Sequence, residues 1–324
     1  MSSLLSLPRV PLATIPTPLQ AACRLSEAIG VNIWLKRDDL TGLGLGGNKV
    51  RGLEYLVADA LSRDCDCLVT GAGPQSNWTM LAALAARCGG LDPYLVFYGD
   101  PVPALGNLLL DEIAGAHVRF TGQADRVSVD GDIESLAADL RARGRRPYCL
   151  PRGGATPLGA AGYVRASMEL AQQLLDAGLT PSQLWLATGS CGTQAGLVAG
   201  ARWLRAPYEV VGVTVSRPVE ECIDRVAALA AGASDLIGAP RADRDDVVVV
   251  DGYLGPGYGR PSPEGDRATR LVARTEGVFV DPVFGAKAMA ALVDAAAAHR
   301  VEGPVVFLVT GGAPTLFSRQ GIAP

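Results

Sequence analysis

The sequence predicts an α/β fold in which a parallel sheet is flanked by crossover helices. From residue 67 onward, short runs rich in β-branched and aromatic residues alternate with longer segments of helical period, which is the order of elements in parallel sheets. Most of the short runs end near Gly, Asp or Pro. The length of 324 residues, with 48% hydrophobic and 19% charged residues, allows two subdomains around a continuous core and argues against disorder.

The expected strands are short and follow one another along the chain. We place them at residues 31–35, 67–70, 94–98, 117–120, 148–150, 184–187, 210–215, 247–250 and 305–309. The expected helices carry their apolar residues on one face, as Val50, Leu53 and Leu56 do in the first of them. They lie at residues 50–61, 78–88, 133–143, 162–177, 193–204 and 286–299. The stretches rich in Pro and Gly are interpreted as loops, at residues 100–106, 151–159 and 255–264.

The charge and the cysteine pattern exclude several classes of protein. The 29 Lys and Arg against 33 Asp and Glu give a net charge of −4, which argues against a nucleic-acid partner. The seven cysteines are scattered without a CxxC pair, and the chain has two histidines, so we expect neither a disulfide framework nor a metal site. Residues 1–18 lack the features of a secretory leader, and no apolar run is long enough to span a bilayer. We therefore expect a cytoplasmic protein without a membrane partner.

A glycine-rich loop at residues 42–47 leads into Asn48 and Lys49 at the start of the first long helix. A Walker A loop requires Gly-Lys followed by Ser or Thr, but here Asn48 precedes the lysine and Val50 follows it, so nucleotide binding of that type is not supported. The glycines also fit GxGxxG, but the next expected strand ends in Gly-Ala-Gly at 71–73, where a dinucleotide site needs a ribose-binding acid. Neither nucleotide interpretation therefore explains the loop.

A third interpretation makes Lys49 a reactive amine beside a planar ligand. The residue lies in the first turn of the expected helix, whose N-terminus carries partial positive charge. That charge disfavours an ammonium group and lowers the lysine pKa, as an amine that forms a Schiff base requires. A flexible glycine turn followed by a solvated lysine explains this motif alone equally well, so the other loops must decide.

The loop at residues 188–196 follows the expected strand 184–187 and carries no basic residue. Its small residues expose successive backbone N–H groups at the start of a helix, which is a ready site for phosphate. A phosphate bound there, together with an imine at Lys49, points to pyridoxal phosphate rather than to a nucleotide. A tight turn between strand and helix, which also needs small residues, remains the alternative.

Two more loops follow strand ends. Gln75, Ser76 and Asn77 come after the expected strand 67–70, and their amides and hydroxyl could hold a substrate carboxylate. Ser and Asn are also common helix N-caps. Thr310 follows the last expected strand and places a hydroxyl where a ring nitrogen could be held. Because ligands of open α/β sheets bind beyond the carboxyl ends of the strands, we expect these loops to face one site.

These loops together resemble the fold-type II pyridoxal-phosphate enzymes, and within them the family of D-cysteine desulfhydrase and 1-aminocyclopropane-1-carboxylate deaminase. The resemblance covers nearly the whole chain and is carried by blocks in the family's order, at residues 36–39, 46–51, 75–77, 188–190, 192–196, 257–259, 281–283 and 310–314. It implies a fold like that of the tryptophan synthase β subunit, with two open, twisted, mainly parallel sheets flanked by helices. It also implies a homodimer and two domains with the cofactor in the cleft between them, the larger of residues 1–51 plus 166–324 and the smaller of residues 52–165.

The resemblance assigns roles to residues of each loop. Lys49 would bind pyridoxal phosphate covalently and act in catalysis together with Ser76 and Tyr258. The other residues implied to bind the cofactor are Asn48, Asn77, Thr188, Gly189, Ser190, Cys191, Gly192, Thr193 and Thr310. The residues implied to line the substrate pocket are Gln75, Ser76, Asn77, Trp78, Tyr258 and Phe284. A neutral hydroxyl at Thr310 stabilises a pyridinium less than a carboxylate would, which favours elimination or replacement over transamination.

The sequence departs from the family pattern at three positions. Phe284 stands where the family has a second tyrosine, and it cannot transfer a proton. Trp78 replaces a His or Gln beside the site, and Cys191 replaces a common glycine of the phosphate loop. We therefore expect a pyridoxal-phosphate lyase that acts on a specialised small amino acid, by α-proton abstraction and β-elimination or deamination to a 2-oxo acid and ammonia. The alternatives are a β-replacement synthase and a non-catalytic homologue that binds the cofactor.

Overall fold

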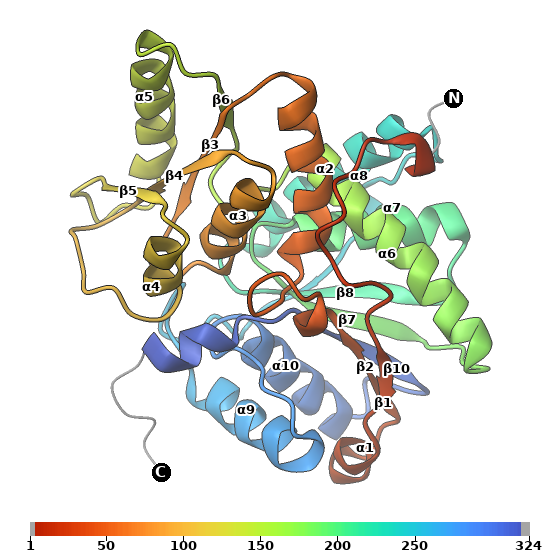
Figure 1. Ribbon diagram of the computed structural model, residues 1–324. Coiled ribbons are helices and arrows are strands. Elements are labelled where there is room, and N and C mark those ends of the chain that lie inside the picture. The colour runs from red at the N-terminus through yellow and green to blue at the C-terminus, as the bar shows by residue number, and fades with distance from the viewer. Residues whose placement is uncertain (1–3, 319–324) are drawn as a thin grey trace.

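The computed structural model describes residues 4–318 and arranges them around two sheets (Figure 1). Within these residues, the larger sheet has six strands, in the spatial order β1 (Leu19–Ala21), β2 (Ile33–Arg37), β10 (Val305–Val309), β7 (Gln183–Thr188), β8 (Glu209–Thr214) and β9 (Val248–Val250). The smaller sheet has four strands, in the order β5 (His117–Phe120), β4 (Asp92–Phe97), β3 (Cys67–Ala72) and β6 (Pro147–Cys149). Neighbouring strands are parallel except β1 and β2. The expected α/β class with two mainly parallel sheets is confirmed.

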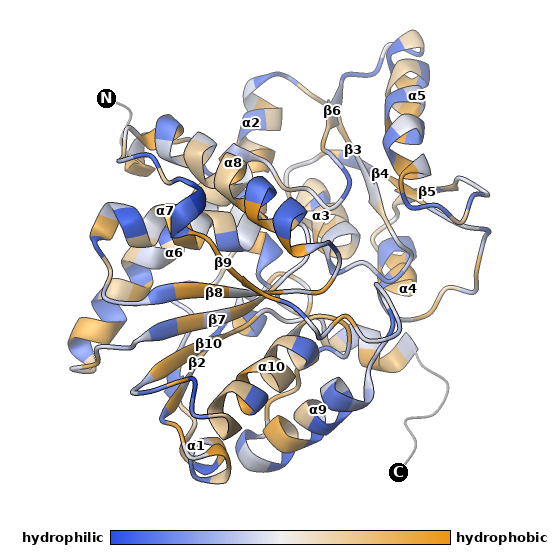
Figure 2. Ribbon diagram, turned by 180° about the vertical axis from the view of Figure 1, so that it is seen from behind, coloured by the Kyte–Doolittle hydropathy of each residue, from blue (hydrophilic) through white to orange (hydrophobic). Residues whose placement is uncertain are grey.

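Helices cover both faces of each sheet. In chain order they are α1 (Cys23–Ile29), α2 (Lys49–Ser62), α3 (Asn77–Cys88), α4 (Gly106–Ile113), α5 (Ser128–Ala142), α6 (Pro157–Asp176), α7 (Gly192–Leu204), α8 (Val219–Ile237), α9 (Pro263–Glu276) and α10 (Gly285–Ala297). Helices α6, α7 and α8 lie on one face of the larger sheet, and α1, α9 and α10 lie on the other (Figure 2). On the smaller sheet, α2 and α3 pack against one face and α5 against the other. This double cover is usual for parallel sheets.

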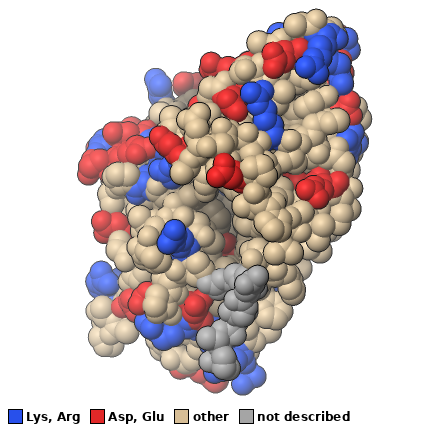
Figure 3. All heavy atoms as spheres, turned by 90° about the vertical axis from the view of Figure 1, so that its left-hand side faces the viewer, with Lys and Arg blue, Asp and Glu red and all other residues tan. Residues whose placement is uncertain are grey.

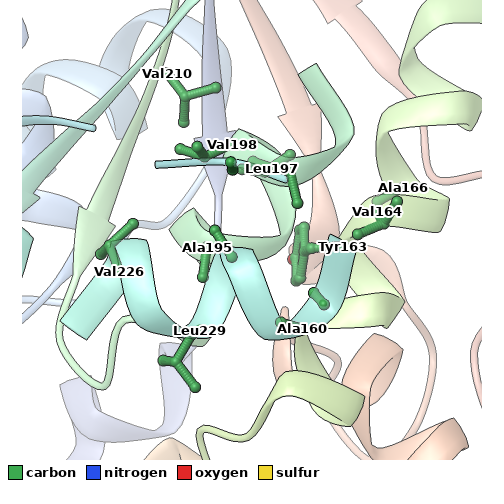
Figure 4. Close-up of a cluster of buried hydrophobic side chains, with 14 of the residues drawn as sticks. Ala160, Tyr163, Val164, Ala166, Ala195, Leu197, Val198, Val210, Val226 and Leu229 are labelled. Carbon is green, nitrogen blue, oxygen red and sulfur yellow. The ribbon is translucent and has the colours of Figure 1, made fainter. Parts of the chain in front are cut away.

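The largest core cluster lies between the larger sheet and the helices α6, α7 and α8 (Figure 4). Tyr163 and Val164 of α6, Val198 of α7 and Val226 of α8 are all at most 3% exposed. Full burial of an apolar side chain of this size stabilises the fold by about 1.5–3 kcal/mol. The cluster therefore fixes α6 and α7, whose N-terminal ends face the site described below.

A buried ionic cluster ties the end of β2 to α2 and α6. Arg51 donates hydrogen bonds to Asp38 at 2.7 and 2.8 Å and to Glu169 at 2.9 and 3.0 Å. Burial would raise the pKa of Asp38, but the charge and hydrogen bonds of Arg51 outweigh burial and hold that pKa below its usual value. The cluster therefore fixes the first turn of α2, which begins with Lys49.

Charged side chains also pair on the surface. Basic and acidic side chains are interspersed on the face of the molecule shown in Figure 3. Arg202 pairs with Asp246 at 2.8 Å, for example, and Arg244 pairs with Asp224 at 2.7 Å.

No helix within residues 4–318 combines the length and the apolar character needed to cross a bilayer.

Every expected strand is present, with bounds shifted by at most two residues. Strand β1 was missed because it is a three-residue antiparallel edge strand without a buried residue. The edge of a sheet tolerates polar and exposed positions, so the periodicity of a half-buried strand does not appear there.

The expected helices are also present, but several bounds were wrong. Helix α6 begins at Pro157 rather than at 162, because Pro157 occupies the first helical position and the hydroxyl of Thr156 accepts a hydrogen bond from Gly159 N. Helix α5 begins at Ser128 rather than at 133. Helix α10 ends at Ala297 rather than at 299, where His299 adopts a left-handed φ of 52°. Helices α1, α4, α8 and α9 were not expected.

Candidate active site

A cavity of about 810 Å³, which includes the solvent-filled space at its mouth, lies between the two sheets, at the C-terminal ends of their strands. Its walls are the loops that follow β7, β8 and β10 of the larger sheet and β3, β4 and β6 of the smaller one. A second cavity of about 330 Å³ adjoins it and shares Asn48, Lys49, Trp78 and Ser190 among its lining residues. Small-molecule sites of open α/β sheets lie at the carboxyl ends of the strands, as this one does.

Lys49 is the first residue of α2 and lines both cavities. Its Nζ donates to Ser190 Oγ at 3.4 Å, and no carboxylate within residues 4–318 pairs with it. Burial lowers the pKa of Lys49 to about 8, and the smaller effect of Cys191 acts in the opposite direction. The sequence predicted a lowered pKa from the helix N-terminus, which acts in the same direction as burial. A neutral amine is thus available near neutral pH.

The glycine-rich loop that precedes Lys49 packs against the loop after β10. Asn48 N donates to Thr310 O at 3.0 Å. Gly311 has a φ of +83°, and a Cβ built there would lie 2.8 Å from the Cα of Gly47. Thr41 Oγ1 holds the other side of the loop, because it bonds both the N–H and the carbonyl of Gly47. These contacts bring Thr310 into the lining of the same cavity as Lys49.

The loop after β7 leads into α7 with an uncapped helix start. The N-cap residue Cys191 has a left-handed φ of 77° and makes no side-chain capping bond, so the first N–H groups of α7 lack a side-chain acceptor. Gly189 and Ser190 line the larger cavity, whereas Ser190, Gly192 and Thr193 line the smaller one. The start of α7 thus offers donors suited to an anion.

Two residues of this loop turn their side chains away from both cavities. Thr188 Oγ1 donates to Gln194 Oε1 at 2.7 Å, and Cys191 Sγ lies 3.8 Å from Cys222 Sγ. Both side chains are buried, and neither lines a cavity. Asn48, by contrast, donates from Nδ2 to Thr193 Oγ1 at 2.9 Å and so orients that hydroxyl.

The turn after β3 carries Ser76 and Asn77 into the larger cavity. Ser76 is the N-cap of α3, and its hydroxyl accepts from Trp78 N at 3.1 Å. Asn77 Oδ1 accepts from Asn107 Nδ2 at 2.7 Å. Because that bond fixes the amide oxygen, the amide nitrogen of Asn77 is the group left to donate into the cavity.

Gln75 does not reach the larger cavity. Its side chain donates to Leu105 O at 2.8 Å and accepts from Asn107 N at 3.0 Å, so it holds the segment before α4. Trp78 lines both cavities but is only 4% exposed. Its Nε1 donates to Thr70 Oγ1 at 2.9 Å, and its ring fills the space where a side chain at Gly154 would lie.

Tyr258 and Phe284 form one wall of the larger cavity and pack edge to face, with ring centroids 6.2 Å apart. Burial raises the pKa of Tyr258, although three nearby guanidinium groups act against this rise. Lys287 Nζ donates to Leu254 O at 2.8 Å and so holds the loop that carries Tyr258. Asp281 accepts the N–H of Gly285 at 2.6 Å and caps α10 directly after Phe284.

Several residues of the cavity were not found from the sequence. Tyr98, Arg126, Arg152 and Arg217 line it, and Asn107 orients Asn77 from outside it. A usable signal existed for three of them, because Tyr98, Arg152 and Arg217 follow β4, β6 and β8 at their carboxyl ends. Arg126 lies in the connection between β5 and α5, and Asn107 lies in the first turn of α4, so both are brought to the site by tertiary packing alone.

Fold and site together define a class of enzyme, in which two parallel sheets enclose a buried lysine and an uncapped helix start suited to a phosphate-bearing aldehyde. The chain matches the family model of pyridoxal-phosphate dependent enzymes over residues 10–311 and belongs to that family. It is 38% identical over 326 residues to the D-cysteine desulfhydrase of Klebsiella pneumoniae subsp. pneumoniae, covering 98% of both chains. It is 40% identical over 320 residues to the D-cysteine desulfhydrase of Salmonella choleraesuis, covering 96% of both.

Solved structures agree with this assignment. The crystal structure of an ACC deaminase homologue superposes with a TM-score of 0.91 at 38% identity, covering 97% of this chain and 95% of that one. A threonine deaminase from T.th. superposes with a TM-score of 0.69 at 22% identity, covering 95% and 94%, and shares the fold. The expected fold type II is confirmed.

The groups present at the site fit pyridoxal phosphate. Lys49 supplies an amine of lowered pKa for the aldehyde. The uncapped start of α7 and the hydroxyl of Ser190 supply donors for the phosphate. The amide of Asn77 and the hydroxyl of Thr310 supply polar partners for the ring. The donor set therefore matches each polar part of the cofactor.

Proposed function

We propose that this chain is a lyase that uses pyridoxal phosphate to remove the α-proton and a β-substituent, or a ring bond, from a small amino acid. The products are a 2-oxo acid and ammonia. The observation that carries the proposal is the amine of Lys49, whose pKa is lowered by burial to about 8 beside the uncapped start of α7. The similarity to D-cysteine desulfhydrases over nearly the whole chain supports it. These relatives favour neither of the two alternatives, replacement synthesis or loss of catalysis.

The proposed cofactor contacts follow from the donors described above. Lys49 would hold the aldehyde through Nζ, and the N–H groups from Gly189 to Thr193 would hold the phosphate. Asn77 would donate from Nδ2 to the phenolic oxygen, and the hydroxyl of Thr310 would serve the ring nitrogen. Bound in this way, pyridoxal phosphate withdraws electrons from the α-carbon of an amino acid.

The chain's own residues then orient the substrate and move protons. Ser76 and Asn77 bind the α-carboxylate at the start of α3, where the helix dipole favours an anion. Lys49 Nζ accepts the α-proton, because burial lowers its pKa to about 8 and so raises the uncharged fraction of this amine near neutral pH. Tyr258 keeps its proton at neutral pH, because burial raises its pKa, and it donates that proton to the leaving group. Phe284 excludes water from this wall but carries no proton.

Borohydride trapping tests the proposal. The protein loaded with pyridoxal phosphate is reduced, digested and mapped, and the label is expected on Lys49. Lys287→Met is a matched control, since Lys287 is a buried lysine outside the cavity, and it is expected to leave the label in place. D-cysteine, L-cysteine, 3-chloroalanine and aminocyclopropane carboxylate are then incubated with the protein. A label on another lysine, or no 2-oxo acid from any of the four, contradicts the proposal.

We also propose the division into a larger domain of residues 1–51 plus 166–324 and a smaller one of residues 52–165, with the cofactor between them. In the described part of the chain, the strands of the smaller sheet all lie within 52–165 and those of the larger sheet all lie outside it, which supports this division.

We propose the cytoplasm as the location. The seven free cysteines, among them the close pair Cys191 and Cys222, support a reducing compartment.

A homodimer is proposed from an exposed apolar stripe along α4. Leu105, Leu109 and Ile113 are 45%, 41% and 72% exposed on successive turns, and Phe317 is 79% exposed. Contiguous exposed apolar side chains of this kind mark interaction surfaces. Light scattering is expected to give a dimeric mass for the wild type and a monomeric mass for Ile113→Glu. A monomeric wild type contradicts the proposal.

A further inference from the structure

We propose that the substrate carries a second anionic group on its side chain, a carboxylate, sulfonate or phosphate, and that Arg126 and Arg152 bind it. This inference rests on the proposed function and deepens it, because it names the class of amino acid. It concerns the end of the larger cavity formed by Tyr98, Tyr258 and Arg126.

The charge of the larger cavity is opposite to that of the chain. Acidic residues outnumber basic ones in the sequence, 33 to 29. Among the described residues that line the cavity, however, Lys49, Arg126, Arg152 and Arg217 are basic and none is acidic. A wall with four basic groups and no acid concentrates anions. The α-carboxylate of an ordinary amino acid and the cofactor phosphate are two such anions, so their places must be considered first.

Two of the proposed phosphate donors lie outside the larger cavity, whereas Gly189 and Ser190 line it and Arg217 donates to Gly189 O at 3.3 Å. The smaller cavity is lined by Gly192 and Thr193 at the start of α7, and its lining contains none of the three arginines. The α-carboxylate is proposed to bind the start of α3, which is formed by Ser76 and Asn77. Among the described residues, Arg126 and Arg152 make no hydrogen bond to residues 188–196 or to the start of α3, so neither of these anions accounts for them.

Of the three arginines that line the larger cavity, Arg126 has no acidic partner among the described residues. Within residues 4–318, no Asp or Glu lies within ion-pair distance of it, whereas Arg152 pairs with Asp130 at 3.1 Å and Arg217 pairs with Glu221. Arg126 donates to Ser216 O at 3.1 Å, and its guanidinium carbon lies 5.3 Å from the centroid of the Tyr258 ring. These contacts fix its position and leave its charge uncompensated.

The arginines are placed where a substrate side chain would extend. The hydroxyl of Tyr98 would lie 2.7 Å from a Cβ built at Gly73, so this ring covers the turn that leads to Ser76. Arg126 and Arg152 both lie near this phenol and act against the rise of its pKa, which burial causes. An amino acid held by its α-carboxylate at Ser76 can therefore direct a side-chain anion to the two guanidinium groups, which offer several N–H donors.

Isothermal titration of the holoenzyme with matched pairs of amino acids tests the inference. The pairs are aspartate with asparagine and O-phosphoserine with serine, each as both enantiomers. We expect the anionic member of a pair to bind at least about tenfold more tightly, because hydrogen bonds between charged groups are the strong ones. We expect Arg126→Met and Arg152→Met each to reduce that preference and to leave the affinity for the neutral member within about twofold. Arg202→Met is the matched control, since Arg202 is an arginine outside both cavities.

The two proposals fail in different ways. Equal affinities within both pairs, or a preference that survives both Arg126→Met and Arg152→Met, overturns the second-anion inference, even if 3-chloroalanine is converted to a 2-oxo acid. A preference that the arginine variants abolish supports it. If the borohydride label is then absent from Lys49, the proposed function alone fails, because the preference within each pair does not depend on which lysine carries the label.

Discussion

Replacing Asn107 with leucine tests whether the orientation of Asn77 controls cofactor binding. Asn107 is fully buried and donates from Nδ2 to Asn77 Oδ1 at 2.7 Å and to Gln75 O at 3.0 Å. Its own Oδ1 has no partner within the described residues. Leucine has a similar size but no donor, so the amide of Asn77 is free to turn its oxygen toward the cavity.

The expected magnitude follows from these bonds. Loss of two neutral hydrogen bonds costs about 2 kcal/mol of the free energy of unfolding, and removal of the unpaired Oδ1 offsets about 1 kcal/mol of that cost. The same substitution is expected to affect cofactor binding more than stability, because the hydrogen bond from Asn77 to the phenolic oxygen of pyridoxal phosphate involves a charged partner. Such bonds are worth about 1.5–3 kcal/mol, so we expect the Kd for pyridoxal phosphate to rise at least about tenfold.

Cofactor affinity and stability are measured on the same samples. The absorbance of the apoenzyme titrated with pyridoxal phosphate gives the Kd, and urea denaturation gives the free energy of unfolding. Ser234→Ala is the matched control, because Ser234 is fully buried in α8, accepts a hydrogen bond from Ala242 N and lies outside both cavities. It is expected to lower stability without changing the Kd. An Asn107→Leu variant with reduced stability but unchanged Kd would refute the orienting role.

Covalent binding of the cofactor to Lys49 is expected to rise with a pH midpoint near 8, because burial lowers the pKa of this amine to about 8; a midpoint at the ordinary lysine value, followed by absorbance, contradicts this. Asp38→Asn leaves Glu169 as the one acidic partner of Arg51 among the described residues, and we expect it to lower the free energy of unfolding by about 3 kcal/mol in urea, whereas no measurable loss would show that the cluster contributes little. Burial raises the pKa of Asp281 to about 6 against its backbone hydrogen bonds, so the unfolded chain releases this proton at lower pH than the folded one. Relative to Asp281→Asn, the free energy of unfolding of the wild type is therefore expected to fall by up to about 3 kcal/mol as the pH rises from about 4 to about 6. A difference in the free energy of unfolding between the two proteins that stays constant over this range argues against the raised pKa.

The sequence predicts the centre of the fold better than its periphery. Strands β7 and β10 lie in the middle of the larger sheet and are covered on both faces. Because most of their residues are buried, both strands are apolar, and their positions can be predicted from the sequence. Strand β1 and helix α4 contribute few buried residues, and tertiary contacts rather than local pattern determine them. Helix α9 is polar on average with three buried residues, and its first residues, Pro263 and Glu264, lie in the segment 255–264 that was interpreted as a loop.

The same distinction applies to the site. Lys49, Ser190 and Thr310 follow strand ends in loops of small residues, and each lines the cavity. Arg126 lies in no such loop, and its position over Tyr258 depends on two chain segments that are distant in sequence. The charge balance of a cavity is a sum over such segments, so it becomes visible only when the fold is known.

The contact between Gly47 and Gly311 has a mechanical consequence. It joins the loop that delivers the amine to the loop that ends in the Thr310 hydroxyl, and both loops belong to the larger sheet. A hinge rotation of one sheet relative to the other would widen or narrow the entrance and leave the separation of these two groups unchanged. Substrate exchange can thus be tuned by mutation at the smaller sheet, without disturbing the spacing on which the chemistry relies.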